Sequence, residues 1–159
     1  MRRVIGVADM AVSNNPAENL VTYSLGSCIG VILYDPTVGV GAILHYMLPD
    51  SSLDTEKAAR VPAMFADTGI PLLFRQSYRL GAAKKNLVVK VVGGAQILDE
   101  NGLFNIGKRN YLALRKIFWK NNVLIKAEHV GGNVNRTVRL DVKTGQVVLK
   151  VSGMGEFEL

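Results

Sequence analysis

The chain has 159 residues, of which 48% are hydrophobic and 20% charged; this composition excludes a disordered chain and predicts one globular domain over residues 1–159. No apolar run approaches the roughly 20 residues of a membrane span, and a single cysteine excludes an intrachain disulfide and suits the cytoplasm. The net charge of +6 comes from scattered residues without interleaved aromatics, so we expect no nucleic-acid partner.

The N-terminal part of the chain predicts strands. Residues 2–12 alternate loosely between apolar and polar side chains, which indicates a first strand and not a signal peptide, because a long apolar segment is missing. Residues 13–19 have the composition of a polar loop. Residues 20–23 form a short strand that leads into a turn.

A hairpin is predicted next, from two apolar runs over residues 28–34 and 40–47 that turn residues separate. If residues 36–37 form a tight loop, Cys28 lies directly opposite His45. Directly opposed residues share a face, with Cβ atoms roughly 4.5–5.5 Å apart. A loop longer by one residue would instead turn His45 to the other face.

A thiol beside an imidazole suggests nucleophilic catalysis. The imidazole of His45 can take the proton of Cys28 and later return it to a leaving group. Gly26 permits a sharp turn whose backbone N–H groups, with Ser27 beside them, could face an oxyanion. Thr22 could bond the imidazole or the incoming amide. The alternative is structural: a small buried cysteine, a core histidine and a strand threonine.

The remainder of the chain predicts helices followed by strands. We expect helices over residues 55–66 (kinked near Pro62), 71–80 and 111–120, strands over 87–92 and 123–129, a hairpin of 136–142 with 146–151, and a loose tail over 152–159. Asp67–Gly69 is expected to break the first helix, and Gly93–Gly94 to form a close turn bordering the site. The predicted fold is therefore α/β with α+β character, a layered mixed sheet with about three flanking helices.

Motifs along nearly the whole chain resemble the CheD family of chemoreceptor glutamine deamidases. They are Thr22-x-x-Leu25-Gly26-Ser27-Cys28, Tyr34-Asp35-Pro36, His45-x-Met47-Leu48-Pro49, residues 66–71, 92–95, 106–110 and 131–133, and Arg136. One departure is His129, where the family pattern leads us to expect an acidic residue. The resemblance implies the layered cysteine-hydrolase fold of deamidating toxins.

The resemblance also implies an activity. It places the family's catalytic cysteine, histidine and threonine on Cys28, His45 and Thr22, and implies hydrolysis of glutamine side-chain amides in receptors to glutamate and ammonia. Weak glutamyl methylesterase activity would follow from the same thioester chemistry. No cofactor or metal is expected, since the two histidines and the cysteine match no zinc spacing.

Two other interpretations stay open. The chain could act mainly as an adaptor that binds a CheC-family phosphatase and chemoreceptors, with Phe104 as a candidate partner contact. Alternatively, Cys28 could be a redox-sensing thiol. Replacing Cys28 by alanine separates the first alternative from catalysis, because adaptor binding would survive.

Overall fold

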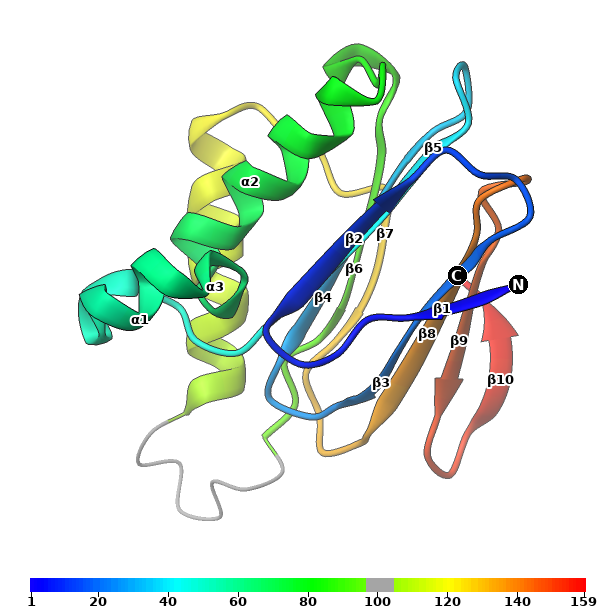
Figure 1. The fold of residues 1–159 in the computed structure, drawn as a ribbon. Coiled ribbons are helices and arrows are strands. Elements are labelled where there is room, and N and C mark those ends of the chain that lie inside the picture. The colour runs from blue at the N-terminus through cyan, green and yellow to red at the C-terminus, as the bar shows by residue number, and fades with distance from the viewer. Residues whose placement is uncertain (97–104) are drawn as a thin grey trace.

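The computed structural model describes residues 1–96 and 105–159, and these residues form two five-stranded sheets packed face to face (Figure 1). The outer sheet has the order β1-β3-β8-β9-β10, formed by Arg2–Val4, Asn19–Leu25, Arg136–Asp141, Val147–Val151 and Gly155–Glu158. The central sheet has the order β2-β5-β4-β6-β7, formed by Asp9–Ser13, Val40–Tyr46, Ile29–Asp35, Val88–Gly93 and Ala127–Val130. Both sheets are mixed, because β1 runs parallel to β3 and β6 parallel to β7.

Helices cover the face of the central sheet that points away from the outer sheet (Figure 1). The α-helices are α1 (Thr55–Arg60), α2 (Ala66–Arg79) and α3 (Ile106–Lys120), and short 3-10 turns occupy Ser51–Leu53, Pro62–Met64 and Lys84–Asn86. The result is a three-layer fold of the predicted α/β class, in which the predicted mixed sheet is divided into two sheets.

The central sheet is buried on both faces, which explains the continuous apolar runs of β4 and β5. On one face, residues such as Ile32 and Ile43 pack against Val138 and Leu149 of the outer sheet. On the other face, residues such as Val31 and Leu44 pack against Leu73, Leu114 and Phe118 of the helices. Burial on both sides fixes the register of the strands that carry the site, because a slip of one residue would exchange the two faces.

Several element boundaries differ from the sequence predictions. Residues 2–12 form two strands in different sheets, since the chain turns between Val4 and Asp9. The segment Asp67–Gly69 does not break a helix but lies in the first turn of α2, where the hydroxyl of Thr68 donates to the carbonyl of Pro62 at 2.6 Å.

Two predictions for the later part of the chain are also wrong. Helix α3 begins at Ile106, not at residue 111. The tail is not loose, because β10 pairs with β9 in an antiparallel ladder. Its polar, Gly-containing sequence reflects an edge strand that faces solvent. Phe104 lies outside the described residues.

Candidate active site

The two sheets meet at a buried contact between Thr22 of β3 and His45 of β5. The Thr22 hydroxyl lies 2.7 Å from Nδ1 of His45 and donates to the carbonyl of Ile5 at 2.8 Å. A threonine hydroxyl has one proton, so with that proton on the Ile5 carbonyl the oxygen must accept from Nδ1–H. The contact therefore fixes the imidazole as the tautomer that carries its proton on Nδ1 and a free lone pair on Nε2.

The Nε2 atom of His45 is buried and has no hydrogen-bond partner among the described residues. Burial lowers the pKa of His45 to about 4, so the ring is neutral at pH 7. An unsatisfied buried acceptor costs on the order of 1–3 kcal/mol, and such exceptions point to a functional role. His45 is thus a neutral, oriented base, and no described residue donates a proton to its Nε2.

Cys28 lies at the end of the turn before β4, half-buried against the core between the sheets. The prediction that it directly opposes His45 is wrong: Gly30 pairs with His45, and Asp35 pairs with Val40. The hairpin loop thus has two more residues than the tight turn assumed. Because strand side chains alternate, an offset of two keeps Cys28 on the face of Gly30 and His45.

The longer hairpin loop has an identifiable cause in the buried carboxylate of Asp35. Its Oδ1 accepts from the N–H of Thr37 at 2.8 Å, and its Oδ2 accepts from the N–H of Ala83 at 2.9 Å. The Asp35 carbonyl also accepts from the N–H of Gly39, which has a φ of 68°. These bonds close a loop of residues 36–39 and so set the register of the hairpin.

The thiol of Cys28 is protonated in the resting site. Burial raises its pKa, and a bond from its own backbone N–H offsets this only in part. The pKa of the buried Tyr46 hydroxyl is also raised, first by burial and then by the charge that Cys28 would carry as a thiolate. The site therefore holds a neutral thiol and a neutral imidazole, and a thiolate must form during the reaction.

A glycine turn after β6 supports the backbone at Cys28. The N–H of Gly94 donates to the Cys28 carbonyl at 2.9 Å, and the N–H of Ala95 donates to the Gly26 carbonyl at 2.8 Å. Gly93 has a φ of 107°, and a Cβ there would lie 2.2 Å from the Cys28 carbonyl oxygen. The predicted close approach of the backbone at Gly93–Gly94 is confirmed beside Cys28, and only glycine fits at the first of these positions.

The candidate oxyanion residues Gly26 and Ser27 lie beside Cys28 and are half-buried. Their carbonyl oxygens are both occupied, by the N–H of Ala95 and by the side chain of Asn110. No bond joins the backbone N–H of Ser27 or Cys28 to another residue in the described part of the chain. This arrangement fixes the orientation of these two peptide groups and leaves their N–H groups unbonded to other described residues, with that of Cys28 bonding its own thiol.

Asn110, on the buried face of α3, connects the two arms of the site. Its Nδ2 donates to the carbonyl of Ser27, which precedes Cys28, at 2.9 Å. It also donates to the carbonyl of Met47, just beyond the strand that carries His45, at 2.8 Å. One amide group thereby holds the segment that carries Cys28 (the nucleophile arm) and the segment that carries His45 (the base arm) at a fixed separation.

Asn110 has no role predicted from the sequence beyond its place in the family motif of residues 106–110, although its position carries a signal. Asn110 shares the buried stripe of α3 with Gly107, Leu114 and Phe118, so it stands as a polar residue at a core position. Its backbone carbonyl accepts from the Tyr46 hydroxyl at 2.7 Å, and its Oδ1 is buried without a partner among the described residues. A buried polar side chain on an apolar stripe needs a specific reason.

Arg136, buried at the start of β8, holds the loops behind the site. Its guanidinium donates to the carbonyls of Gly93 and Gly131 at 3.1 and 2.8 Å. Its Nε donates to Nδ1 of His129 at 2.8 Å. Burial and the charge of Arg136 lower the pKa of His129, which suits a neutral acceptor. His129 thus accepts a hydrogen bond from Arg136 at the position where the family pattern leads us to expect an acidic residue.

The described residues contain no group of three or more His, Cys, Asp or Glu side chains placed to hold a metal ion. None of the helices in the described part of the chain is long and apolar enough to span a membrane.

The amino-acid sequence is similar to those of one family of known proteins. A family model described as CheD chemotactic sensory transduction matches residues 47–151. A protein of Syntrophus aciditrophicus, named probable chemoreceptor glutamine deamidase CheD 1, is 61% identical over 150 residues, 94% of each chain. Proteins with the same deamidase name are 49% identical in Solibacter usitatus (94% of this chain, 89% of the relative) and 44% identical in Syntrophotalea carbinolica (98% of each).

Proposed function

This chain belongs to the CheD family, and from that membership we propose that it hydrolyses the side-chain amide of specific glutamines in chemoreceptors, giving glutamate and ammonia. The observation that carries the proposal is the buried Nε2 of His45, which has no partner in the described part of the chain, while the other ring nitrogen contacts Thr22. A base held in one tautomer, near a cysteine on the same face, matches the demands of cysteine hydrolase chemistry.

In the first step Cys28 is the nucleophile. Nε2 of His45 takes the thiol proton as the sulfur attacks the amide carbon, and an S–C bond forms while the carbonyl oxygen becomes an oxyanion. His45 is suited to this because its pKa of about 4 leaves it unprotonated at neutral pH. The Thr22 hydroxyl accepts from Nδ1–H throughout and stabilises the imidazolium that forms.

The oxyanion is stabilised by backbone donors. The N–H groups of Ser27 and Cys28, which bond no other residue in the described part of the chain, are the donors we assign to it, because the carbonyl oxygens of the same two peptide groups are held by Ala95 and Asn110. The N–H of Cys28, which bonds its own thiol in the resting site, turns to the oxyanion once the sulfur has attacked. Donors that are fixed before the reaction cost no reorganisation when charge develops.

Collapse of the tetrahedral intermediate breaks the C–N bond. His45 returns its proton to the departing nitrogen, which leaves as ammonia, and a thioester remains on Cys28. Water then attacks the thioester with His45 as base, and the products are a glutamate carboxylate and the regenerated thiol. The same second half-reaction would accept a thioester formed from a glutamyl methyl ester, so we propose weak methylesterase activity with methanol as leaving group.

We assign the reaction to the cytoplasm, because the single cysteine must stay reduced to act. Binding to a CheC-family phosphatase is a further proposal that the family membership supports, and it does not require the thiol.

Incubation with a glutamine-containing cytoplasmic fragment of a chemoreceptor tests the activity. We expect stoichiometric ammonia release and conversion of defined glutamines to glutamate, read by mass spectrometry of peptides. Absence of conversion under conditions in which the fragment binds would contradict the proposal and favour an adaptor.

A further inference from the structure

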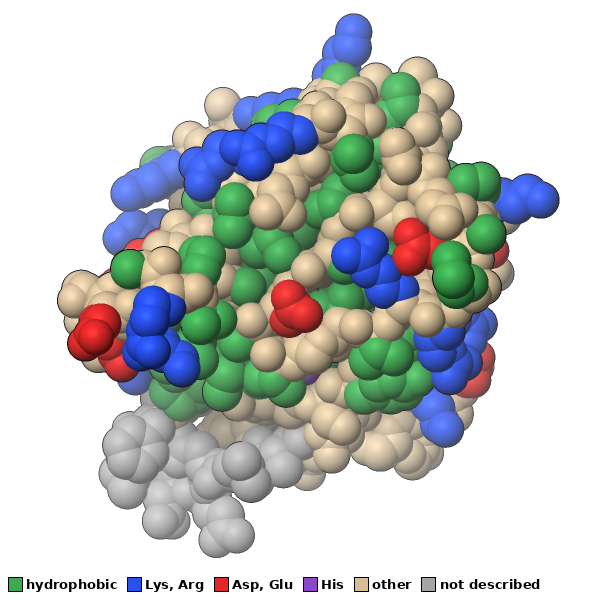
Figure 2. All heavy atoms as spheres, viewed as in Figure 1, with side chains coloured by type: hydrophobic (Ala, Val, Ile, Leu, Met, Phe, Trp, Pro, Cys, Tyr) green, Lys and Arg blue, Asp and Glu red, His purple; other side chains and the backbone are tan. Residues whose placement is uncertain are grey.

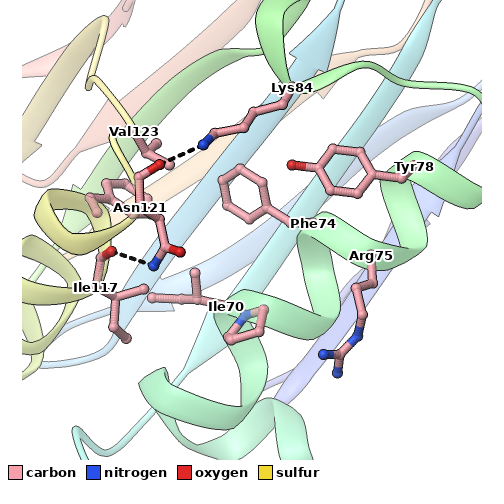
Figure 3. Close-up of a pocket in the computed structure, with 10 residues that line it drawn as sticks. Ile70, Phe74, Arg75, Tyr78, Lys84, Ile117, Asn121 and Val123 are labelled. Atoms are coloured by element: carbon pink, nitrogen blue, oxygen red, sulfur yellow. Dashed lines mark hydrogen bonds between the residues drawn. The ribbon is translucent and has the colours of Figure 1, made fainter.

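Three adjoining recesses open at the C-terminal end of α3, with volumes of about 220, 200 and 450 Å³. Val123, just beyond the helix, lines all three. Figure 3 shows the first recess, where Ile70 of α2 points toward Ile117 of α3, and Phe74 of α2 points toward Asn121, just beyond the end of α3. We call the combined area the α3-end surface; it is formed by the residues that line the three recesses.

Large apolar side chains of this surface are exposed. Trp119 is 81% exposed and Leu124 87% exposed, and both line the second recess. Tyr78, at the edge of the first recess, is also exposed. Exposed apolar patches of this kind mark interaction sites, and tryptophan is among the side chains that contribute most to binding energy.

The charges on this surface have one sign. Arg75, Lys84, Lys85 and Arg115 line the recesses, whereas no Asp or Glu among the described residues lines any of them. Figure 2 shows that Lys and Arg side chains predominate over the upper part of the helical layer. Basic residues in the last turn of a helix can be explained by its dipole, but Arg75 and Arg115 lie outside the last turns of α2 and α3. Lys84 and Lys85 belong to a 3-10 helix of three residues, which is too short to have a large dipole.

The charge selects among possible occupants. A second copy of this chain, paired through the same surface, would place basic residues against basic residues, which is unfavourable. A nucleic-acid strand would need successive aromatic platforms for base stacking, whereas the two exposed aromatic side chains of this surface, Tyr78 and Trp119, line different recesses. An acidic protein segment that inserts an apolar side chain satisfies both features.

We propose that the α3-end surface is an exosite that docks an acidic segment of the protein substrate. The inference rests on the proposed function, because it names where the receptor substrate is held. Helix α3 has 15 residues and is about 22 Å long, and Asn110 near its other end contacts the Cys28 arm. The docked segment is therefore remote from the reacting glutamine, and the exosite adds affinity without entering the chemistry.

Trp119 allows a direct test, because it is the only tryptophan in the chain. A tryptophan-free, glutamine-containing cytoplasmic fragment of a chemoreceptor is titrated into the Cys28→Ala protein, which leaves the fragment unmodified. We expect a saturable shift of the Trp119 emission to shorter wavelength. Arg75→Glu combined with Lys85→Glu, two exposed residues, should raise the Kd about tenfold through lost charge attraction.

A matched control carries Lys143→Glu and Lys150→Glu, which change the net charge equally on exposed residues of the outer-sheet region. With Cys28 intact, the exosite variant should raise KM for the fragment about tenfold, leave kcat unchanged, and hydrolyse a short glutamine peptide like the wild type.

Each contrary result has a distinct meaning. Deamidation without any change in Trp119 emission overturns the exosite, whereas an emission shift without deamidation overturns the proposed function instead. Equal weakening by the control variant, an equal response to a single-stranded oligonucleotide, or self-association that the exosite variant abolishes would each also overturn the exosite.

Discussion

The hydroxyl of Thr22 lies 2.7 Å from Nδ1 of His45. This contact joins the outer sheet to the central sheet at the imidazole that we propose as the catalytic base. Because the same hydroxyl donates to the Ile5 carbonyl, it selects one tautomer of the imidazole. The orientation of the base thus depends on a residue that never touches the reacting carbon in the mechanism proposed.

Replacing Thr22 by valine should therefore impair catalysis more than folding. The side chain keeps its shape but loses the oxygen that accepts from Nδ1–H, so kcat for ammonia release should fall by about 10- to 100-fold. Thr22→Ser keeps a hydroxyl and should retain most of the activity. Equal kcat values for the valine variant and the wild type, with both folded by circular dichroism, would show that Thr22 does not orient the base.

Asn110→Ala should lower kcat about 100-fold with KM changed by less than about threefold, because the Ser27 and Met47 carbonyls lose their common donor and the two arms can separate. Ser77→Ala is the matched control: Ser77 is equally buried, but among the described residues its hydroxyl bonds only Leu73, within α2. Thermal unfolding of both variants measures the stability each loses. If the control lowers kcat as much, the effect of Asn110 is general destabilisation and not positioning.

The buried His45 should make the folded state sensitive to acid. Its pKa is about 4 when folded and about 6.5 when unfolded, so the unfolded chain binds more protons between these values. Stability should accordingly fall as the pH drops from about 6.5 to 4, by about 3 kcal/mol from this residue at the lower end. Urea unfolding at pH 7 and pH 4.5 should show a smaller loss for His45→Gln than for the wild type. An identical pH dependence would contradict a buried neutral imidazole.

Gly93→Ala should destabilise the protein by more than about 3 kcal/mol, because the new Cβ would overlap the Cys28 carbonyl oxygen. Gly131→Ala offers the comparison. Gly131 also has a positive φ of 81°, but a Cβ there meets nothing within 4 Å, so about 1 kcal/mol of backbone strain is expected. Urea denaturation of the two variants distinguishes the steric overlap at Gly93 from backbone strain alone. Equal losses of stability in both variants would argue against the steric overlap.

The fold class and most strands could be predicted because the burial of a strand determines the pattern of apolar residues in its sequence. Strands β4 and β5 are continuous apolar runs, and β8 alternates buried and half-buried residues as a strand with one wetter face does. The division of residues 2–12 between two sheets could not be predicted, since a strand of either sheet gives the same local pattern.

The hairpin register depended on a contact that local sequence does not encode. Asp35 holds its loop partly through the N–H of Ala83, far along the chain, so the loop residues alone suggested a tighter turn. An error of two residues preserved the shared face of Cys28 and His45, whereas an error of one would have separated them. The catalytic roles of Cys28, His45 and Thr22 stay predictions.

The most direct test of the central claim compares the wild type with Cys28→Ala on the same receptor fragment, with glutamine-to-glutamate conversion read by mass spectrometry. We predict conversion at defined glutamines by the wild type alone, while both proteins keep the same thermal stability within experimental error. Conversion by both proteins would show that Cys28 is not the nucleophile and would contradict the mechanism.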